Sequence, residues 1–326
     1  MVKLVVFGEQ HKLGLLEGQR VLDLALAGEV YRKSTGRQGT GGELALSSLQ
    51  GLIESGRQGL DLVGEVSERL RGSDQPGLWA NASGLELHAP WPGQRFALVG
   101  SNNANHVATA FTNMGTPRTV EEVRDSTRKG VPSGFWGMAR PVMGPDARIS
   151  IPSRAKGLFD YEGEPGVVLG KQGKNIKAEN IADYIWGVTL IVDWSIREET
   201  WPPKPYSPLM PLKNFDHSKS IGPCIVVDEI DPNNFRIETY VNGQRRQAFD
   251  TSEMIFSFGE VLEHFSRDFT FFPGDVIAGG TGAGTAIDQT VPNPDGSWPR
   301  DLFLKPGDEV EVRAEGIGSI FGHIVA

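Results

Sequence analysis

The chain has 326 residues, of which 39% are hydrophobic and 22% are charged. This composition is typical of a globular protein with one large or two unequal domains, and apolar runs such as 185–192 are far shorter than the roughly 18 residues that a membrane helix needs. Lysine and arginine total 32 against 41 aspartate and glutamate residues, which gives a net charge of -9. The sequence also has no cluster of basic residues, so nucleic acid is not an expected partner.

The N-terminal region predicts a small α+β domain. Its first residues, MVKLVVFGEQ, lack the apolar core of a signal peptide, so we expect a cytoplasmic protein. Short strand-like runs lead into two segments with a helical spacing of apolar residues, 44–53 and 59–70. Glycine and proline then gather in RGSDQPG and APWPG, which predicts a connector. We place the small domain at 1–80, the connector at 81–95 and a larger domain at 96–326.

Short strand-like runs bounded by turn residues dominate the larger domain, among them 164–169, 185–192 and 309–314. This spacing favours an α+β, β-rich fold, a sandwich or a barrel, over a doubly wound sheet. One helix interrupts the strands. It is predicted to begin at Thr251 or Ser252, and its apolar stripe runs from Ile255 to Phe265.

Three carboxylates stand at the ends of predicted strands. Glu162 and Glu164 are two residues apart where a strand begins, so strand alternation directs both side chains to one face. Asp193 ends the apolar run YIWGVTLIV, where a buried acid is unfavourable unless it is paired or coordinated. Such an all-oxygen set suits Mg²⁺, Mn²⁺ or Ca²⁺ better than Zn²⁺. A solvated strand face would explain the two glutamates equally well.

Six motifs extend this interpretation, and they follow one another in the order DYEGEPGVVLGK, VDWSIREE, LKNFDHSKSIGP, VNGQRRQAFDTSEMIFS, PGDVIAGGTGAG and LKPGDEVEVRAEGIGS. In this order they resemble the fumarylacetoacetate hydrolase family over roughly residues 96–326. The resemblance implies the mixed β-sandwich roll of that family, a smaller N-terminal domain and a homodimer. It also implies that Glu162, Glu164 and Asp193 hold the metal ion, the same three residues that their places at strand ends single out.

Two further residues are expected to be catalytic. His106, in LVGSNNANHVATA, follows a predicted strand and so lies on a turn or at a helix start, where a lone histidine is more often solvated than catalytic. The family resemblance implies instead that it acts as a general base on water. Lys213 follows the proline-rich WPPKPYSPLMPL and could be an ordinary surface lysine. The resemblance implies that it stabilises an oxyanion of the substrate.

Substrate-binding residues are expected at two places. Arg197 could bind substrate or pair with Glu198 or Glu199. The segment GGTGAGT lacks the GK[ST] ending of a phosphate-binding loop. By resemblance, the backbone near Gly280 and the hydroxyl of Thr281 hold the carboxylate or keto end of a substrate.

One position departs from the family pattern. Many relatives place a glutamate three residues after the histidine, and this chain has Thr109, which cannot offset the charge of a protonated imidazole. We expect Glu121 or Glu122, in the polar VEEV segment, to close over His106 as a lid and replace the missing carboxylate. Otherwise the reaction needs no activated water, or turnover is slow.

The leading interpretation is a metal-dependent hydrolase that cleaves a carbon–carbon bond in a small 1,3-dicarbonyl or acylpyruvate-like molecule. The same metal and lysine could stabilise an enolate formed by decarboxylation, dehydration or tautomerisation, which gives a lyase or isomerase of a 2-oxo acid. A third interpretation is a binding protein with a degenerate site. Trp201, Tyr206 and Trp298 lie in proline-rich segments and favour a bulky substrate, or else they cap the surface or a dimer contact.

Overall fold

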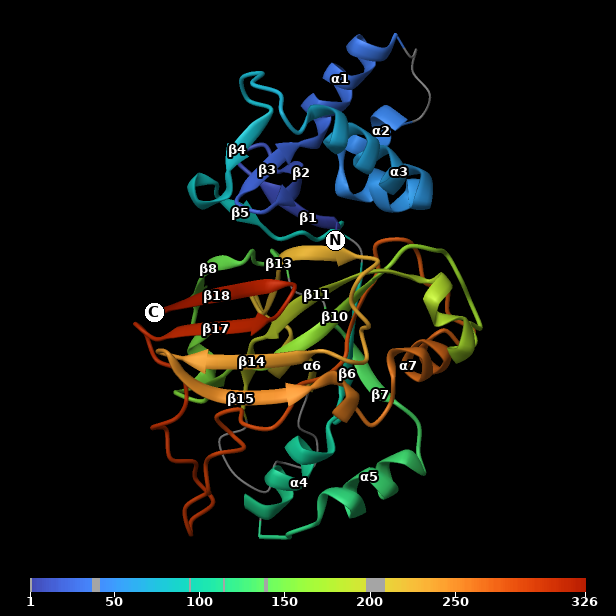
Figure 1. Ribbon diagram of the computed structural model, residues 1–326. Coiled ribbons are helices and arrows are strands. Elements are labelled where there is room, and N and C mark those ends of the chain that lie inside the picture. Colours follow the sequence, from blue (N-terminus) through green and yellow to red (C-terminus); the bar gives the residue numbers. More distant parts are fainter. Residues whose placement is uncertain (1, 37–41, 94, 114, 138–139, 198–208) are drawn as a thin grey trace.

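The computed structural model describes residues 2–36, 42–93, 95–113, 115–137, 140–197 and 209–326 (Figure 1). The N-terminal region contains β1 (Val2–Phe7), β2 (Lys12–Glu17), β3 (Arg20–Asp23), α1 (Leu24–Thr35), α2 (Gly42–Ser47), α3 (Leu49–Leu70), β4 (Trp79–Asn81) and β5 (Leu87–His88). The larger region begins with β6 (Phe96–Gly100), α4 (Ala104–Asn113), α5 (Val120–Arg128), β7 (Ser133–Gly137), β8 (Asp146–Ser150), β9 (Phe159–Asp160), β10 (Gly163–Leu169), β11 (Ile185–Asp193) and β12 (Ser195–Ile196). It ends with α6 (Leu209–Lys213), β13 (Lys219–Val227), β14 (Arg236–Val241), β15 (Gln244–Asp250), α7 (Phe258–Phe265), β16 (Val276–Ala278), β17 (Glu309–Ala314) and β18 (Gly318–Val325).

Two large sheets organise the described part of the chain, beside a 2-stranded sheet of β12 and β9. An 11-stranded sheet follows the order β4-β3-β2-β1-β13-β11-β10-β16-β6-β7, with β5 paired to β1, and a 5-stranded sheet follows the order β15-β14-β17-β18-β8. Most neighbours are antiparallel, whereas β16 with β6 and β18 with β8 are parallel. The α+β, β-rich fold class predicted from the sequence is therefore confirmed.

Both faces of the large sheet are buried. On β11, Leu190 joins a core that also contains residues of the 5-stranded sheet, such as Val312. The neighbouring Ile191 points to the opposite face and joins a second core that contains residues of α3, such as Leu52 and Val63. The N-terminal helices thus cover one face of the sheet, as Figure 1 shows at the top of the molecule, and the second sheet covers the other face.

The N-terminal region shares its sheet with the larger region. Strand β1 pairs antiparallel with β13, placing Leu4 opposite Ile225. The division into 1–80, 81–95 and 96–326 stays a prediction. None of the helices in the described part of the chain is long and apolar enough to cross a membrane.

Two helix boundaries differ in detail from the sequence prediction. Helix α3 joins the end of the first predicted segment, 44–53, to the second, 59–70, and it bends at Gly56, where φ is 57° and the backbone leaves the helical region. Helix α7 begins at Phe258 and not near Thr251, which lies in a short 3-10 turn. Its cap is Ser257, which exchanges hydrogen bonds with Glu260 in a capping box. Thr251 and Ser252 lie too far before the helix to form such a box with it.

Candidate active site

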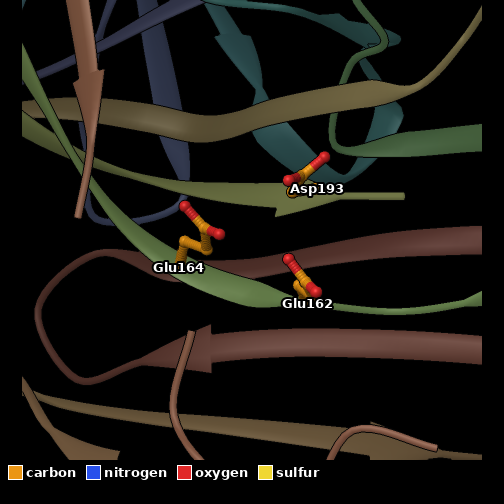
Figure 2. Close-up of side chains that lie close together, drawn as sticks. All are labelled: Glu162, Glu164 and Asp193. Carbon is orange, nitrogen blue, oxygen red and sulfur yellow. The ribbon is translucent and has the colours of Figure 1, made fainter. Parts of the chain in front are cut away.

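Three buried carboxylates form the centre of the site. Glu162, Glu164 and Asp193 each offer one oxygen, and these oxygens all lie within 4.8 Å of one another. The residues are only 5%, 2% and 1% exposed. Figure 2 shows the three side chains converging from neighbouring segments of the large sheet. The predicted cluster is therefore present as a geometric unit.

The local backbone explains this convergence. Gly163 pairs with Val192 in the antiparallel ladder of β10 and β11, and Asp193 donates its backbone N–H to the carbonyl of Glu162 at 2.9 Å. A side chain at position 163 would clash, because a Cβ there would lie 2.5 Å from the hydroxyl oxygen of Thr239. The glycine between the two glutamates thus lets the strand run close to the second sheet while both carboxylates point into the site.

Cationic side chains surround the carboxylates. The Nζ of Lys213 donates hydrogen bonds to Glu162 Oε2 at 2.5 Å, to Asp193 Oδ2 at 2.9 Å and to the Ser195 hydroxyl at 2.6 Å. Arg197 pairs through Nη2 with Glu162 Oε1 at 2.7 Å and through Nε with Asp160 Oδ2 at 2.8 Å. Its alternative partners by sequence, 198 and 199, lie outside the described residues. The structure therefore brings Lys213 and Arg197 to the cluster.

The electrostatics of the two glutamates differ. Burial raises the pKa of Glu162, but Lys213 and Arg197 outweigh burial and hold the pKa well below its ordinary value. The pKa of Glu164 is raised well above its ordinary value, first by burial and then by the charges of Asp193 and Glu162. Glu164 accepts a hydrogen bond from Gly280 N–H at 3.2 Å. A divalent cation among the three oxygens would offset this repulsion, so the donor set fits Mg²⁺, Mn²⁺ or Ca²⁺.

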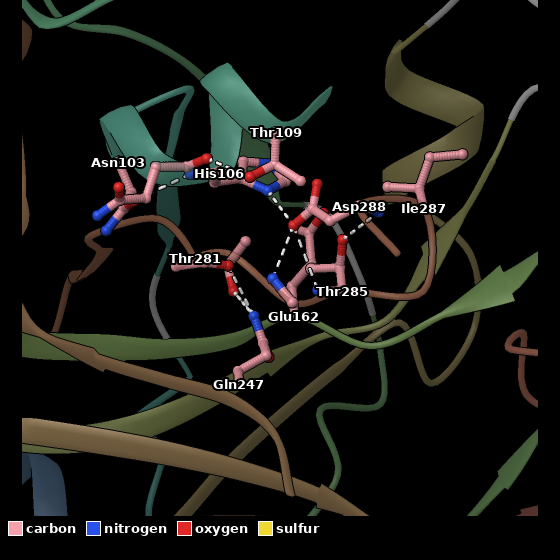
Figure 3. Close-up of polar contacts among 12 residues, drawn as sticks. Asn103, His106, Thr109, Glu162, Gln247, Thr281, Thr285, Ile287 and Asp288 are labelled. Carbon is pink, nitrogen blue, oxygen red and sulfur yellow. Dashed lines mark hydrogen bonds and ion pairs between the residues drawn. The ribbon is translucent and has the colours of Figure 1, made fainter. Parts of the chain in front are cut away.

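His106 has a carboxylate partner that the sequence interpretation missed. Its Nδ1 lies 2.8 Å from Oδ2 of Asp288, which also accepts the backbone N–H groups of Gly284 at 2.9 Å and Thr285 at 3.2 Å (Figure 3). Burial lowers the pKa of His106, but the charge and hydrogen bond of Asp288, with a contribution from Glu162, raise it above 6.5 overall. Asp288 thus holds the imidazole in one orientation and favours its protonated form.

The sequence interpretation expected Glu121 or Glu122 to supply the carboxylate that is missing at Thr109, and in the structure Asp288 is the carboxylate beside His106. Thr109 donates its hydroxyl to the carbonyl of Asn105 at 2.8 Å, four residues earlier in α4. The carboxylate of Glu122 accepts the N–H of Thr119 at 2.9 Å and so closes the capping box at the start of α5. Asp288 therefore occupies the place that the sequence interpretation gave to a lid carboxylate.

The predicted substrate-binding loop, with Gly280 and Thr281, lies against the start of β10. Gly280 adopts φ of +89°, and a Cβ there would lie 3.1 Å from the carbonyl of Val99, so the conformation and the space both favour glycine. The Thr281 hydroxyl donates to the carbonyl of Gly163 at 2.9 Å and accepts from Gln247 Nε2 at 2.8 Å. Figure 3 shows this pair on the opposite side of the view from Asp288. A role of Gly280 and Thr281 in binding substrate stays a prediction.

Two other predicted site residues, Trp201 and Tyr206, lie outside the described residues. Trp298 is 6% exposed and belongs to the hydrophobic core of the larger region, so packing accounts for its position. Its predicted contact with substrate stays a prediction.

Sequence reasoning also missed two buried charges. Asp160 is fully buried and accepts the N–H groups of Ala286 at 2.8 Å and Ile287 at 3.1 Å, thereby tying the loop that carries Asp288 to Arg197. Lys219 is fully buried beside Asp193. The only sequence signal for either residue is a charge directly adjoining an apolar strand.

Comparisons with known proteins identify the family of this chain. The family model described as fumarylacetoacetate (FAA) hydrolase C-terminal matches residues 95–325. Oxaloacetate tautomerase YisK of Bacillus subtilis is 29% identical over 246 residues, which are 74% of this chain and 74% of that protein. The mitochondrial oxaloacetate tautomerase Fahd2a of Rattus norvegicus is 32% identical over 193 residues, 59% of this chain and 58% of that protein. The solved fumarylacetoacetate hydrolase of Exiguobacterium antarcticum shares the fold, with a TM-score of 0.73, 24% identity and 100% coverage of both chains. With its carboxylate cluster and its family match over most of its length, the chain belongs to the fumarylacetoacetate hydrolase family.

Proposed function

We propose that this protein is a divalent-metal-dependent isomerase that interconverts the keto and enol forms of a 2-oxo acid. The observation that carries the proposal is the His106–Asp288 pair, a proton acceptor that lies within electrostatic reach of Glu162 in the carboxylate cluster. The relatives named as oxaloacetate tautomerases favour this reaction over carbon–carbon cleavage, which the sequence alone favoured.

The carboxylates would hold the metal ion. Glu162, Glu164 and Asp193 provide an all-oxygen set of the kind that Mg²⁺ and Mn²⁺ prefer. When bound, the ion would supply positive charge for the keto and enolate oxygens of the substrate.

His106 would move the proton. Because Nδ1 donates to Asp288, Nε2 is the ring nitrogen that can accept a proton from the carbon next to the keto group. The C–H bond breaks, its electron pair forms the enolate, and the imidazolium is stabilised by the negative charge of Asp288. Return of the same proton to the enolate oxygen gives the enol and restores neutral His106.

Lys213 and Arg197 would prepare the site for negative charge. Burial lowers the pKa of Lys213, but Asp193 and Glu162 raise it above its ordinary value, so the ammonium form persists near neutral pH. Burial likewise opposes the charge of Arg197, and Asp160 and Glu162 outweigh it. These fixed cations hold the carboxylates in place before substrate enters, which is the preorganisation that enolate stabilisation requires.

Carbon–carbon hydrolysis is the second candidate function. The observation in its favour is again the His106–Asp288 pair, because a histidine held by a buried carboxylate can also deprotonate water. In that case the proton taken by His106 comes from water, and the substrate ends as two fragments.

A product assay in D₂O separates the two functions. Oxaloacetate and a series of acylpyruvates are incubated with the protein and Mg²⁺ or Mn²⁺, and the enol absorbance and the products are followed by spectrophotometry and NMR. We expect accelerated loss or gain of the enol with deuterium exchange at the adjacent carbon and no fragments. Fragments formed at the rate of enol loss would contradict the isomerase and support the hydrolase. His106→Ala serves as the inactive control.

We also propose that the protein forms a homodimer, and light scattering measures its molar mass in solution.

A further inference from the structure

A second buried lysine occupies the carboxylate cluster and has no part in the proton transfer. Lys219 is 0% exposed, and its Nζ lies 2.7 Å from Asp193 Oδ1. The same nitrogen donates hydrogen bonds to the carbonyl of Lys213 at 2.5 Å and to the carbonyl of Ser218 at 3.1 Å. Burial lowers the pKa of Lys219 and Asp193 opposes this shift, and the contacts of Nζ, all with oxygen acceptors, suit an ammonium group that has no access to a substrate.

The sheet register fixes this lysine beside the cluster. Asp193 ends β11 and Lys219 begins β13, and the two residues are directly opposite in the antiparallel ladder. Cross-strand neighbours in such a ladder place their side chains on the same face. Asp193 is therefore held on both oxygens, with Lys219 at Oδ1 and Lys213 at Oδ2 (Figure 2 shows the orientation of Asp193).

The charges at the site are nearly balanced without a metal ion. Four carboxylates, Glu162, Glu164, Asp193 and Asp160, face the three cations Arg197, Lys213 and Lys219. Without Lys219, the same four acidic side chains would face only two cations. An ordinary site of three carboxylates attracts a divalent ion more strongly than this one.

We propose that Lys219 is an internal counter-charge that stabilises the metal-free carboxylate cluster and weakens the binding of a divalent ion. The inference depends on the metal site of the proposed function, but not on the reaction. It predicts that neutral side chains at position 219 tighten ion binding while they destabilise the metal-free protein.

Two effects of removing Lys219 oppose each other, and their sizes decide the direction. Losing a contact that orients a ligand typically weakens metal binding by about 10- to 100-fold. At an effective dielectric constant of about 20, a unit charge about 4 Å from another changes a binding equilibrium by on the order of 1,000-fold. The repulsion between Lys219 and a metal ion is larger still, because the ion carries two charges. We therefore expect a net gain in affinity of at least about 10-fold.

The test compares Lys219→Gln and Lys219→Met with the wild type. Glutamine keeps an N–H donor for the carbonyl of Lys213, and methionine keeps the length of the stem without the charge. Calorimetry measures the affinity for Mg²⁺ and Mn²⁺, and thermal unfolding is recorded with and without the ion. Lys171→Gln, on an exposed lysine, is the matched control, and Glu164→Gln shows whether the calorimetric signal comes from the cluster.

We expect both Lys219 variants to bind the ion more tightly, to melt at a lower temperature without it, and to gain more stability from it than the wild type. A folded Lys219→Gln protein with unchanged or weaker affinity would overturn the inference. If the variants fold only in the presence of Mn²⁺, that rescue supports it, whereas failure to fold at saturating ion contradicts it. A wild-type protein that binds neither ion would refute the proposed metal site itself, an outcome distinct from an unchanged affinity in the variants.

Discussion

Replacing Asp288 with asparagine isolates the charge that supports His106. The amide oxygen can still accept the N–H groups of Gly284 and Thr285, which lie 2.9 and 3.2 Å from the present carboxylate oxygen, so we expect the loop to keep its conformation. A hydrogen bond to a charged group contributes about 1.5–3 kcal/mol and a neutral one about 0.5–1.5 kcal/mol. The protonated imidazole should therefore lose about 1–2 kcal/mol of stabilisation, which corresponds to roughly 5- to 30-fold in rate.

The pH dependence provides the second readout. Burial already lowers the pKa of His106, and loss of the Asp288 charge should let burial prevail, so the pKa falls. Since the base acts in its neutral form, the acidic limb of the rate profile should move to lower pH when enol conversion is followed from about pH 5 to 9. Asp301→Asn, on an exposed aspartate, is the control. A variant Asp288→Asn with the wild-type rate and an unmoved acidic limb would refute the role of this pair.

Three further changes test other parts of the site. Glu164→Gln should weaken Mg²⁺ and Mn²⁺ binding at least about 10-fold in calorimetry, and an unchanged affinity would exclude this residue as a ligand. Gly163→Ala should lower the free energy of unfolding by about 2 kcal/mol or more, because the new Cβ would lie 2.5 Å from the hydroxyl of Thr239, and a double variant with Thr239→Ala should recover part of the loss in urea unfolding. Because the folded pKa of His106 exceeds 6.5, its protonation stabilises the fold below about pH 6.5, and this contribution disappears as the pH rises through the folded pKa. His106→Gln should therefore lower the free energy of unfolding more near pH 5.5 than near pH 8.5. Equal losses at both pH values would contradict the raised pKa.

The three carboxylates could be predicted from the sequence because each is identified by its position on its own strand. Glu162 and Glu164 are separated by the two-residue repeat of a strand, and Asp193 ends a run that is apolar on both faces. Position along a strand thus determines the face on which each side chain lies. The family resemblance then added His106 and Lys213, for which no local spacing gives a role.

The partners of these residues could not be predicted in the same way. His106 and Asp288 are 182 positions apart and come from α4 and from the loop after β16, which only the sheet order brings together. Lys219 meets Asp193 through the register of β11 and β13, and one residue of slip would direct it to the other face. The start of α7 was misplaced because Thr251 and Ser257 are both good caps, and only Ser257 has its glutamate three residues later within the helix.

The pairing of β1 with β13 gives the residues before the family-matched segment a role in protecting the fold from self-association. If they were removed, β13 would lose the partner of Val226 and Val227 and become a bare sheet edge, and Ile225 would lose the helices that shield it from water. Long apolar edges of this kind recruit strands from other molecules. A shortened chain that began at the family-matched segment would carry every described side chain of the candidate active site and still be prone to aggregate.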